Sequence, residues 1–169
     1  MTLKTCSLQN KKERKNEKML RGVFVKVPQS FETAVLSVAL KPITVEQYKW
    51  YNLLSQNEVW TNQDGENAFN SPFYNGKDFL QQIQKKHFIV FIKLQAYDQD
   101  GAYCDITTYH DFLQSDCQIL ILINDCEFLE IFMKDEALIK DVYQNALSSG
   151  YHATYITDDN DGRTKMNVL

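Results

Sequence analysis

Cys104 and His110 are the cysteine and histidine that lie nearest to each other in this 169-residue chain. They could pair as nucleophile and base, with Asp105 or Asp111 orienting the imidazole ring. Their spacing matches no recognised catalytic signature, and composition alone often places such residues near one another. We therefore expect a non-enzymatic protein rather than an enzyme.

Cys117 and Cys126 lie in the most apolar part of the chain, where CQILILI and EFLEIFM predict two strands of a hairpin. A turn near Asp125 places Cys117 opposite Phe132 and leaves Cys126 at the turn. The two thiols are then further apart than the Cα separation of about 7 Å that a disulfide tolerates. We expect Cys117 to be a small core residue and Cys126 to be the more exposed thiol.

Metal and cofactor motifs are not found in the sequence. The cysteines lack CxxC spacing, the three histidines lack HxxxH spacing, and DDNDG (158–162) lacks the glutamate that completes a calcium loop. The patterns GxxxxGK[ST], GxGxxG, GxSxG and HExxH are also absent. We expect no metal and no cofactor, and reduced thiols in a cytoplasmic protein.

The formal net charge of −4 hides a strong asymmetry along the chain. Residues 1–21 contain seven basic and two acidic residues, whereas residues 98–161 contain 14 carboxylates and two lysines. Such a field attracts cationic partners and repels phosphate backbones. We expect an immunity-like or inhibitor-like interaction protein whose anionic face binds a basic protein partner. The residues predicted for this face are Asp125, Glu127, Glu130, Asp158, Asp159 and Asp161.

An aromatic cluster supports an alternative function, a small-ligand-binding protein or an enzyme. Two aromatic segments, YKWYNLLS (48–55) and NEVWTN (57–62), predict a hairpin, and a loop rich in turn residues follows at 62–76. Aromatic residues at such a loop pack together more often than they bind ligands. The residues predicted to line this pocket are Trp50, Trp60, Phe69, Phe73 and Tyr74.

The N-terminal segment, residues 1–18, is basic and lacks hydrophobic periodicity, so we expect a disordered extension. Nucleic-acid binding would depend on this segment alone. Met19 stands directly before the first predicted strand and could be the true start. The remainder, 19–169, is expected to form a single domain, and no apolar stretch approaches the roughly 18 residues of a membrane span.

The order of the remaining predicted elements defines the fold class. Strands are expected at 20–28, 87–97 and 151–157 in addition to the two hairpins, and helices at 30–43, 77–86, 107–115 and 135–150. Adjacent hairpins favour antiparallel pairing. We therefore expect an α+β fold with a mixed, largely antiparallel sheet and three to four helices. Apolar residues on both faces of 117–123 predict that both faces of the sheet are covered.

Four segments resemble an uncharacterised family of small proteins from low-GC Gram-positive bacteria, a domain of unknown function. They are RGVFVKVP, YKWY, DITTYHDFLQSDCQILILINDCEF and ALSSGYHATYITDDNDGRT, and the resemblance spans about residues 20–164. The third segment is the most specific. The resemblance implies no catalytic residue, and it leaves residues 1–18 outside the family.

Overall fold

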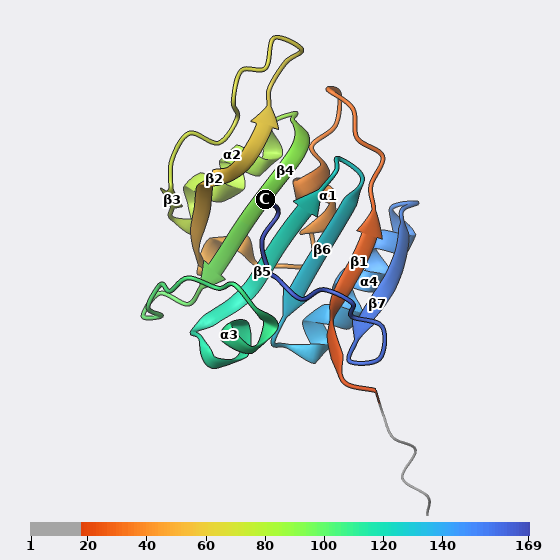
Figure 1. Ribbon diagram of the computed structural model, residues 1–169. Coiled ribbons are helices and arrows are strands. Elements are labelled where there is room, and N and C mark those ends of the chain that lie inside the picture. The colour runs from red at the N-terminus through yellow and green to blue at the C-terminus, as the bar shows by residue number, and fades with distance from the viewer. Residues whose placement is uncertain (1–17) are drawn as a thin grey trace, which may run out of the picture.

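The computed structural model describes residues 18–169, which form one seven-stranded sheet and four α-helices (Figure 1). The strand order is β3-β2-β4-β5-β6-β1-β7, and every neighbouring pair is antiparallel. The strands are β1 (Leu20–Lys26), β2 (Lys49–Trp60), β3 (Phe73–Tyr74), β4 (Phe88–Tyr97), β5 (Cys117–Asn124), β6 (Phe128–Met133) and β7 (His152–Thr157). The helices are α1 (Val35–Ala39), α2 (Gly76–Gln84), α3 (Tyr109–Gln114) and α4 (Glu136–Ser148), with a 3-10 turn, η1 (Val45–Gln47). The predicted α+β class is confirmed. The predicted basic extension lies outside the described residues, apart from Lys18.

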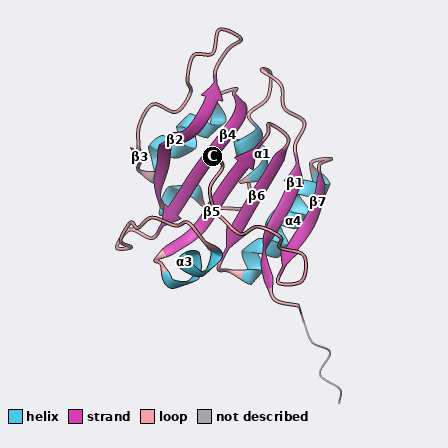
Figure 2. Ribbon diagram, in the orientation of Figure 1, coloured by secondary structure: helices cyan, strands magenta, loops and turns pink. Residues whose placement is uncertain are grey.

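Three helices cover one side of the sheet, which we call the first face. Figure 2 shows α1, α2 and α4 behind the strands. Their apolar residues join those of the strands in one buried cluster. The helical members that are fully or almost fully buried are Val35, Leu36, Ala39, Phe79, Ile83, Ile139, Val142 and Ala146. Burying such side chains contributes roughly 1.5–3 kcal/mol each, so this cluster is the main core.

The opposite side, the second face, is covered mostly by chain without regular structure. The loop 98–108, the short helix α3 and the C-terminal tail 158–169 lie over it, and the tail crosses the strands toward β4 (Figure 1). A second buried cluster lies beneath them, made of Tyr97, Ile106, Phe112, Cys117, Leu120, Leu122, Phe132, Ile156 and Met166. Both faces are therefore covered, as the apolar character of β5 predicts.

The hairpin of β5 and β6 is confirmed, but its register differs from the prediction. Asp125 and Cys126 both adopt positive φ, 55° and 63°, in a turn that pairs Asn124 with Phe128. The turn is therefore centred on Cys126, and Phe132 faces Leu120 instead of Cys117. Cys117 and Cys126 are both free thiols.

The predicted aromatic hairpin at 48–62 is wrong, because these residues form the single long strand β2. Asn52 pairs with Leu94 and Asn57 pairs with Ile92, so five steps along β2 correspond to two steps along β4. The three extra residues form a bulge between Asn52 and Asn57, and the polar Gln56 lies within it.

The helix predicted at 30–43 is much shorter in the structure. Ser30 forms a local turn, accepting from the Glu32 backbone N–H, and α1 begins only at Val35. At that start, buried His87 accepts a hydrogen bond from the Leu36 N–H through Nε2 at 3.3 Å. Burial lowers the pKa of His87, which favours the neutral ring that this contact requires.

The caps of the later helices are formed by residues close in sequence. Thr108 and Asp111 form a reciprocal capping box at α3. Asp135 caps α4 by accepting from two backbone N–H groups. Gly150 follows α4 at φ 80°, the left-handed conformation that glycine adopts without strain.

Candidate functional site

The six carboxylates predicted to form one anionic face are separated in the structure. Asp125 and Glu127 lie at the hairpin turn, beside the Lys26 end of β1, where the Val27 N–H bonds the Glu127 carbonyl. Asp158 and Asp159 follow Thr157, which pairs with Leu20 at the other end of β1. The two groups are therefore separated by the length of a strand.

Four of the six are also neutralised by cations. Glu127 pairs with Lys26 at 3.4 Å and Asp159 with Lys18 at 2.9 Å, both at exposed positions. Exposed pairs of this kind contribute little to stability. Glu130 and Asp161 are instead largely buried ion-pair partners, as described next. Asp125 and Asp158 remain exposed, and neither belongs to an ion pair among the residues described.

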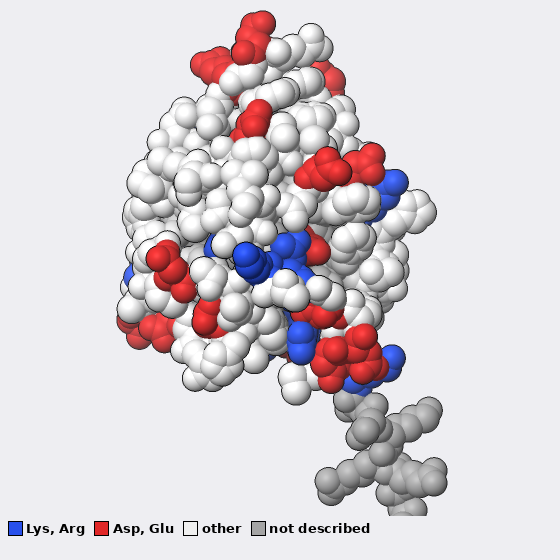
Figure 3. Space-filling view, viewed as in Figure 1, with Lys and Arg blue, Asp and Glu red and all other residues white. Residues whose placement is uncertain are grey.

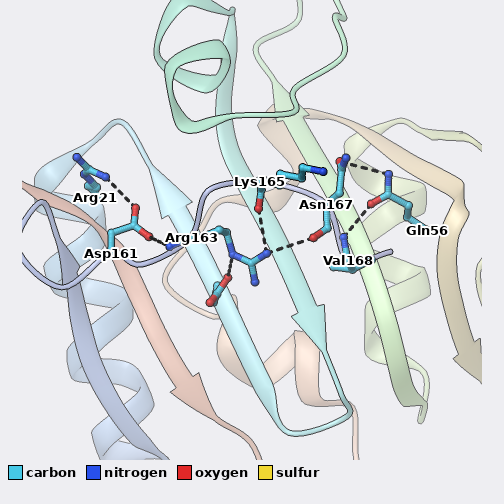
Figure 4. Close-up of polar contacts among 8 residues, drawn as sticks. Arg21, Gln56, Asp161, Arg163, Lys165, Asn167 and Val168 are labelled. Atoms are coloured by element: carbon cyan, nitrogen blue, oxygen red, sulfur yellow. Dashed lines mark hydrogen bonds and ion pairs between the residues drawn. The ribbon is translucent and has the colours of Figure 1, made fainter.

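Glu130 and Asp161 hold the C-terminal tail on the second face (Figure 4). Arg21 on β1 pairs with Asp161 at 2.9 Å, and the Asp161 side chain is 3% exposed. Arg163 Nε lies 2.5 Å from Glu130 Oε2 on β6, with both side chains below 20% exposed. Both carboxylates thus have a structural role that charge counting along the sequence does not indicate.

The end of the tail is fastened to the middle of the sheet by polar side chains. Buried Lys93 on β4 donates to the Ile106 carbonyl and to Asn167 Oδ1. Gln56 on β2 donates to Asn167 and accepts from the Val168 N–H (Figure 4). Burial lowers the pKa of Lys93, and the negative charges of Asp105 and Asp111 oppose part of this shift.

A cavity of about 600 Å³ lies between the tail and β7. Two charged residues that line it already bind groups of the protein. Arg163 contacts Glu130 and donates to the carbonyls of Lys165 and Asn167. In the amide orientation that satisfies both contacts, Asn124 also accepts from the Arg163 guanidinium. The arrangement resembles a clamp on the tail more than a ligand site.

The aromatic residues predicted to line one pocket are divided between the two faces. Trp50 and Phe69 are fully buried in the first-face core, where Trp50 stacks on Phe79 at 4.1 Å between centroids. Tyr74 packs against Phe69, whereas its neighbour Phe73 is 42% exposed. Consecutive residues of a strand point to opposite faces, so Phe73 and Tyr74 cannot line one pocket. Trp60 stacks on Phe88 at 6.3 Å.

The thiols offer little nucleophilic character. Burial raises the pKa of Cys117 to about 12. Burial also raises the pKa of Cys126, and the neighbouring carboxylates Asp125 and Glu127 add to that shift. Both thiols are thus held in the protonated form, which is the weaker nucleophile. Cys104 and His110 are exposed, and among residues 18–169 no hydrogen bond joins them.

Carboxylates without a cation gather at the end of the sheet where β4 leads into the loop 98–108. Tyr97 on β4 pairs with Cys117 on β5. Asp98 directly follows Tyr97 and Asp116 directly precedes Cys117, so the pairing of the strands brings the two carboxylates to the same end of the sheet. Asp98, Asp100 and Asp116 line a shallow cavity of about 140 Å³, and Asp105 lies further along the same loop. We call Asp98, Asp100, Asp105 and Asp116 the acidic end. Figure 3 shows acidic side chains over this loop and around α3, while basic side chains follow the tail.

Two neighbouring lysines, Lys49 and Lys134, bind backbone carbonyls and form no ion pair with the acidic end among the residues described. Lys49 donates to the carbonyl of Gly101 at 2.7 Å, and Lys134 binds the Ser115 carbonyl. Within residues 18–169, none of the four carboxylates of the acidic end forms an ion pair. Their charge therefore faces solvent.

An apolar cavity adjoins this loop. It measures about 310 Å³ and is lined by Tyr51, Asn52, Leu53, Leu54, Pro72 and Tyr103. We call it the apolar hollow. Tyr103 links it to the acidic end, because its hydroxyl donates to Asp105 at 2.9 Å and its ring lies 4.6 Å from that of Tyr51. Burial raises the pKa of Tyr103 to about 12, so its hydroxyl stays a donor at neutral pH.

Among residues 18–169, no cluster of three or more histidine, cysteine or acidic side chains is arranged to bind a metal ion. No described helix combines the length and the apolar character that crossing a membrane requires.

The residues that the sequence analysis missed are the tail anchors Lys93, Arg163 and Asn167, and the exposed loop residues Asp98 and Tyr103. Lys93 had a usable signal, since it is the single charge inside the apolar run FIVFIKLQAY. A lysine in a strand that is apolar on both faces must be buried and hydrogen-bonded. The others show no local signal that separates them from ordinary surface residues.

The described residues form a small α+β protein with one seven-stranded antiparallel sheet. The chain belongs to the family described as "Protein of unknown function (DUF2691)", whose model matches residues 20–167. The "Uncharacterized protein YncE" of Bacillus subtilis (strain 168) is 29% identical over 154 residues, covering 89% of this chain and all of that protein. These matches confirm the resemblance to an uncharacterised family. No solved structure matches the chain significantly.

Proposed function

We propose that this protein is a non-enzymatic interaction domain that binds a basic protein partner through the acidic end. The supporting observations are that Asp98, Asp100 and Asp116 line one cavity, that Asp105 lies on the same loop as Asp98 and Asp100, and that all four are exposed and form no ion pair among residues 18–169. An inhibitor-like or immunity-like role fits such a surface, because uncompensated charge accelerates association with an oppositely charged protein.

The proposal uses the acidic end in place of the carboxylates that the sequence analysis predicted to bind the partner. Glu130 and Asp161 hold the tail, and their charges are already matched by Arg163 and Arg21. A partner would have to break those ion pairs to use them, which costs several kcal/mol per separated charge in a poorly solvated site. The acidic end requires no such disruption.

The test is affinity capture from a lysate of the native host with three forms of the full chain. They are the wild type, the charge-reversed Asp98→Lys/Asp100→Lys variant, and an Asp64→Lys/Asp141→Lys control. Asp64 and Asp141 are exposed and belong to no ion pair among the residues described, so the control changes the net charge equally at other sites.

We expect one protein to be captured by the wild type and the control, and to be lost with Asp98→Lys/Asp100→Lys. Capture should also fall steeply between about 0.15 and 1 M salt, because the Debye length shortens from about 8 Å to about 3 Å. Capture that is equal for all three forms, or the lack of any salt-sensitive partner, overturns the proposal.

A further inference from the structure

The bulge in β2 sets this strand apart from the other strands of the sheet. Between Asn52 and Asn57 the strand carries three more residues than its partner β4. The bulge leaves Leu54 46% exposed, although β2 otherwise buries Trp50 and Val59 completely. Bulges of this kind re-aim side chains and often lie beside functional sites.

The residues that flank the bulge are polar and incompletely satisfied. Asn52 donates to the Ser71 carbonyl and Asn57 to the Phe69 carbonyl. Their Oδ1 atoms are both buried without a hydrogen-bond partner. Unpartnered polar atoms in an interior are uncommon and costly, so the bulge is held in place at an energetic cost.

Exposed apolar side chains converge at the same place. Leu54, Phe73 and Tyr103 are 46%, 42% and 41% exposed. Phe73 lies 5.2 Å from Tyr51 between ring centroids, and Tyr103 lies 4.6 Å from Tyr51 on another side. Leu54 and Tyr103 thus line the apolar hollow, and Phe73 adjoins it through its contact with Tyr51. Contiguous exposed apolar surface is typical of interaction sites.

The carboxylates beside the apolar hollow favour a binding segment that carries positive charge. The hollow shares Tyr103 with the loop that carries Asp98, Asp100 and Asp105. An apolar segment without charge would gain nothing from these carboxylates, and an acidic segment would be repelled by them. A segment that combines cationic residues with a large apolar side chain matches both parts of the surface.

We propose that the apolar hollow receives a leucine, phenylalanine or similar side chain of a protein segment whose flanking lysines or arginines contact the acidic end. This inference rests on the proposed function and adds the chemistry that the partner must present. The apolar anchor would supply most of the affinity, because fully burying a leucine or phenylalanine side chain removes a large apolar area from water. The cationic residues would supply the rate and the charge selectivity.

Three synthetic pentapeptides, KKFKK, KKSKK and EEFEE, provide the test. Their binding to the full chain is followed by the shifts of backbone amide signals in two-dimensional NMR. We expect KKFKK to shift the signals of Leu53, Leu54 and Tyr103 together with those of Asp98 and Asp100. We expect KKSKK to shift only the acidic end, roughly tenfold more weakly, which corresponds to about 1.4 kcal/mol. EEFEE should not bind.

Matched variants locate the apolar contact. Leu54→Gln should weaken KKFKK binding several-fold and leave KKSKK unchanged. Leu147→Gln is the control, since Leu147 is 43% exposed on α4 at a distant position. Both leucines are exposed, so neither substitution should prevent folding.

The outcomes separate the two proposals. Equal affinities of KKFKK and KKSKK, or equal effects of the two leucine variants, overturn the role of the hollow and leave the acidic end as the binding surface. Binding of neither cationic peptide, or binding that survives Asp98→Lys/Asp100→Lys, overturns the proposed function itself.

Discussion

The two faces of the sheet are covered by different kinds of chain and are held by different interactions. On the first face, the helices satisfy most of their own backbone hydrogen bonds, and apolar contacts such as that of Trp50 with Phe79 join them to the strands. On the second face, the tail 158–169 has no regular structure, so its backbone groups need other partners.

The sheet supplies some of these partners from side chains, and the tail supplies others. Gln56 accepts from the Val168 N–H, and Arg163 donates to two carbonyls of the tail itself. The loop adds the Thr107 carbonyl, which accepts from the Met166 N–H. Covering a sheet with helices therefore requires mainly apolar residues, whereas covering it with irregular chain requires buried polar residues.

The largest expected loss of stability comes from a substitution in the core of the first face. Trp50→Ala should lower the free energy of unfolding by about 3–5 kcal/mol, because it leaves a cavity against Phe79 and removes the indole hydrogen bond to the Val45 carbonyl. Chemical denaturation measures this change. Trp60→Ala is the control, since Trp60 is only partly buried. A loss as large for Trp60 as for Trp50 would contradict the assignment of the core.

An intermediate loss of stability is expected from a substitution that releases the tail from the second face. Arg163→Leu should cost about 2–3 kcal/mol, because it leaves Glu130 without its cation at a largely buried position. Adding Glu130→Gln should restore part of this loss. Hydrogen exchange should accelerate in residues 158–169 and remain unchanged in α4.

The control for Arg163 is Lys86→Met, which removes an exposed ion pair with Glu32 and should produce no resolvable change. Uniform acceleration of exchange over the whole chain, in place of acceleration confined to the tail, would show that Arg163 supports the fold generally and is not a specific clamp.

The smallest expected effect concerns the pH dependence of the second face. The pKa of Lys93 in the folded protein lies below the ordinary value of 10.5 that the unfolded chain has. At pH values between the two pKa values, the unfolded chain therefore binds more protons than the folded protein does. Wild-type stability should therefore fall as pH is lowered from 10.5, by at most about 1.4 kcal/mol per pH unit. Lys93→Met should lack this slope, measured as the difference between the two denaturation free energies at each pH. Parallel pH curves for the two proteins would refute the depressed pKa.

Much of the fold could be predicted from local patterns. The caps at Thr108 and Asp135, the turn at Asp125 and the C-terminal glycine of α4 are set by residues close in sequence. The predicted hairpin within 48–62 failed because polar residues at a strand bulge resemble those of a turn. The predicted helix start failed because His87, more than fifty residues away, provides an acceptor there.

The candidate site could be predicted much less well. Counting carboxylates along the chain identified an acidic half but could not show which charges are matched. Arg21 neutralises Asp161 across 140 residues of sequence, and Arg163 reaches Glu130 only after the tail crosses the sheet. The acidic end was missed because Asp116 joins Asp98 and Asp100 only through the pairing of β4 with β5.

The sequence by itself determined the α+β class, the β5–β6 hairpin and the helix caps, because these depend on periodicity and on contacts within a few residues. Only the tertiary structure decided which face each aromatic residue occupies and which carboxylates remain free. It also explains Gly22 in β1, where a Cβ atom would lie 2.1 Å from the Ile131 carbonyl oxygen of β6. Burial, ion pairing and close backbone approach are properties of segments distant in sequence, so they arise only when the sheet and the tail assemble.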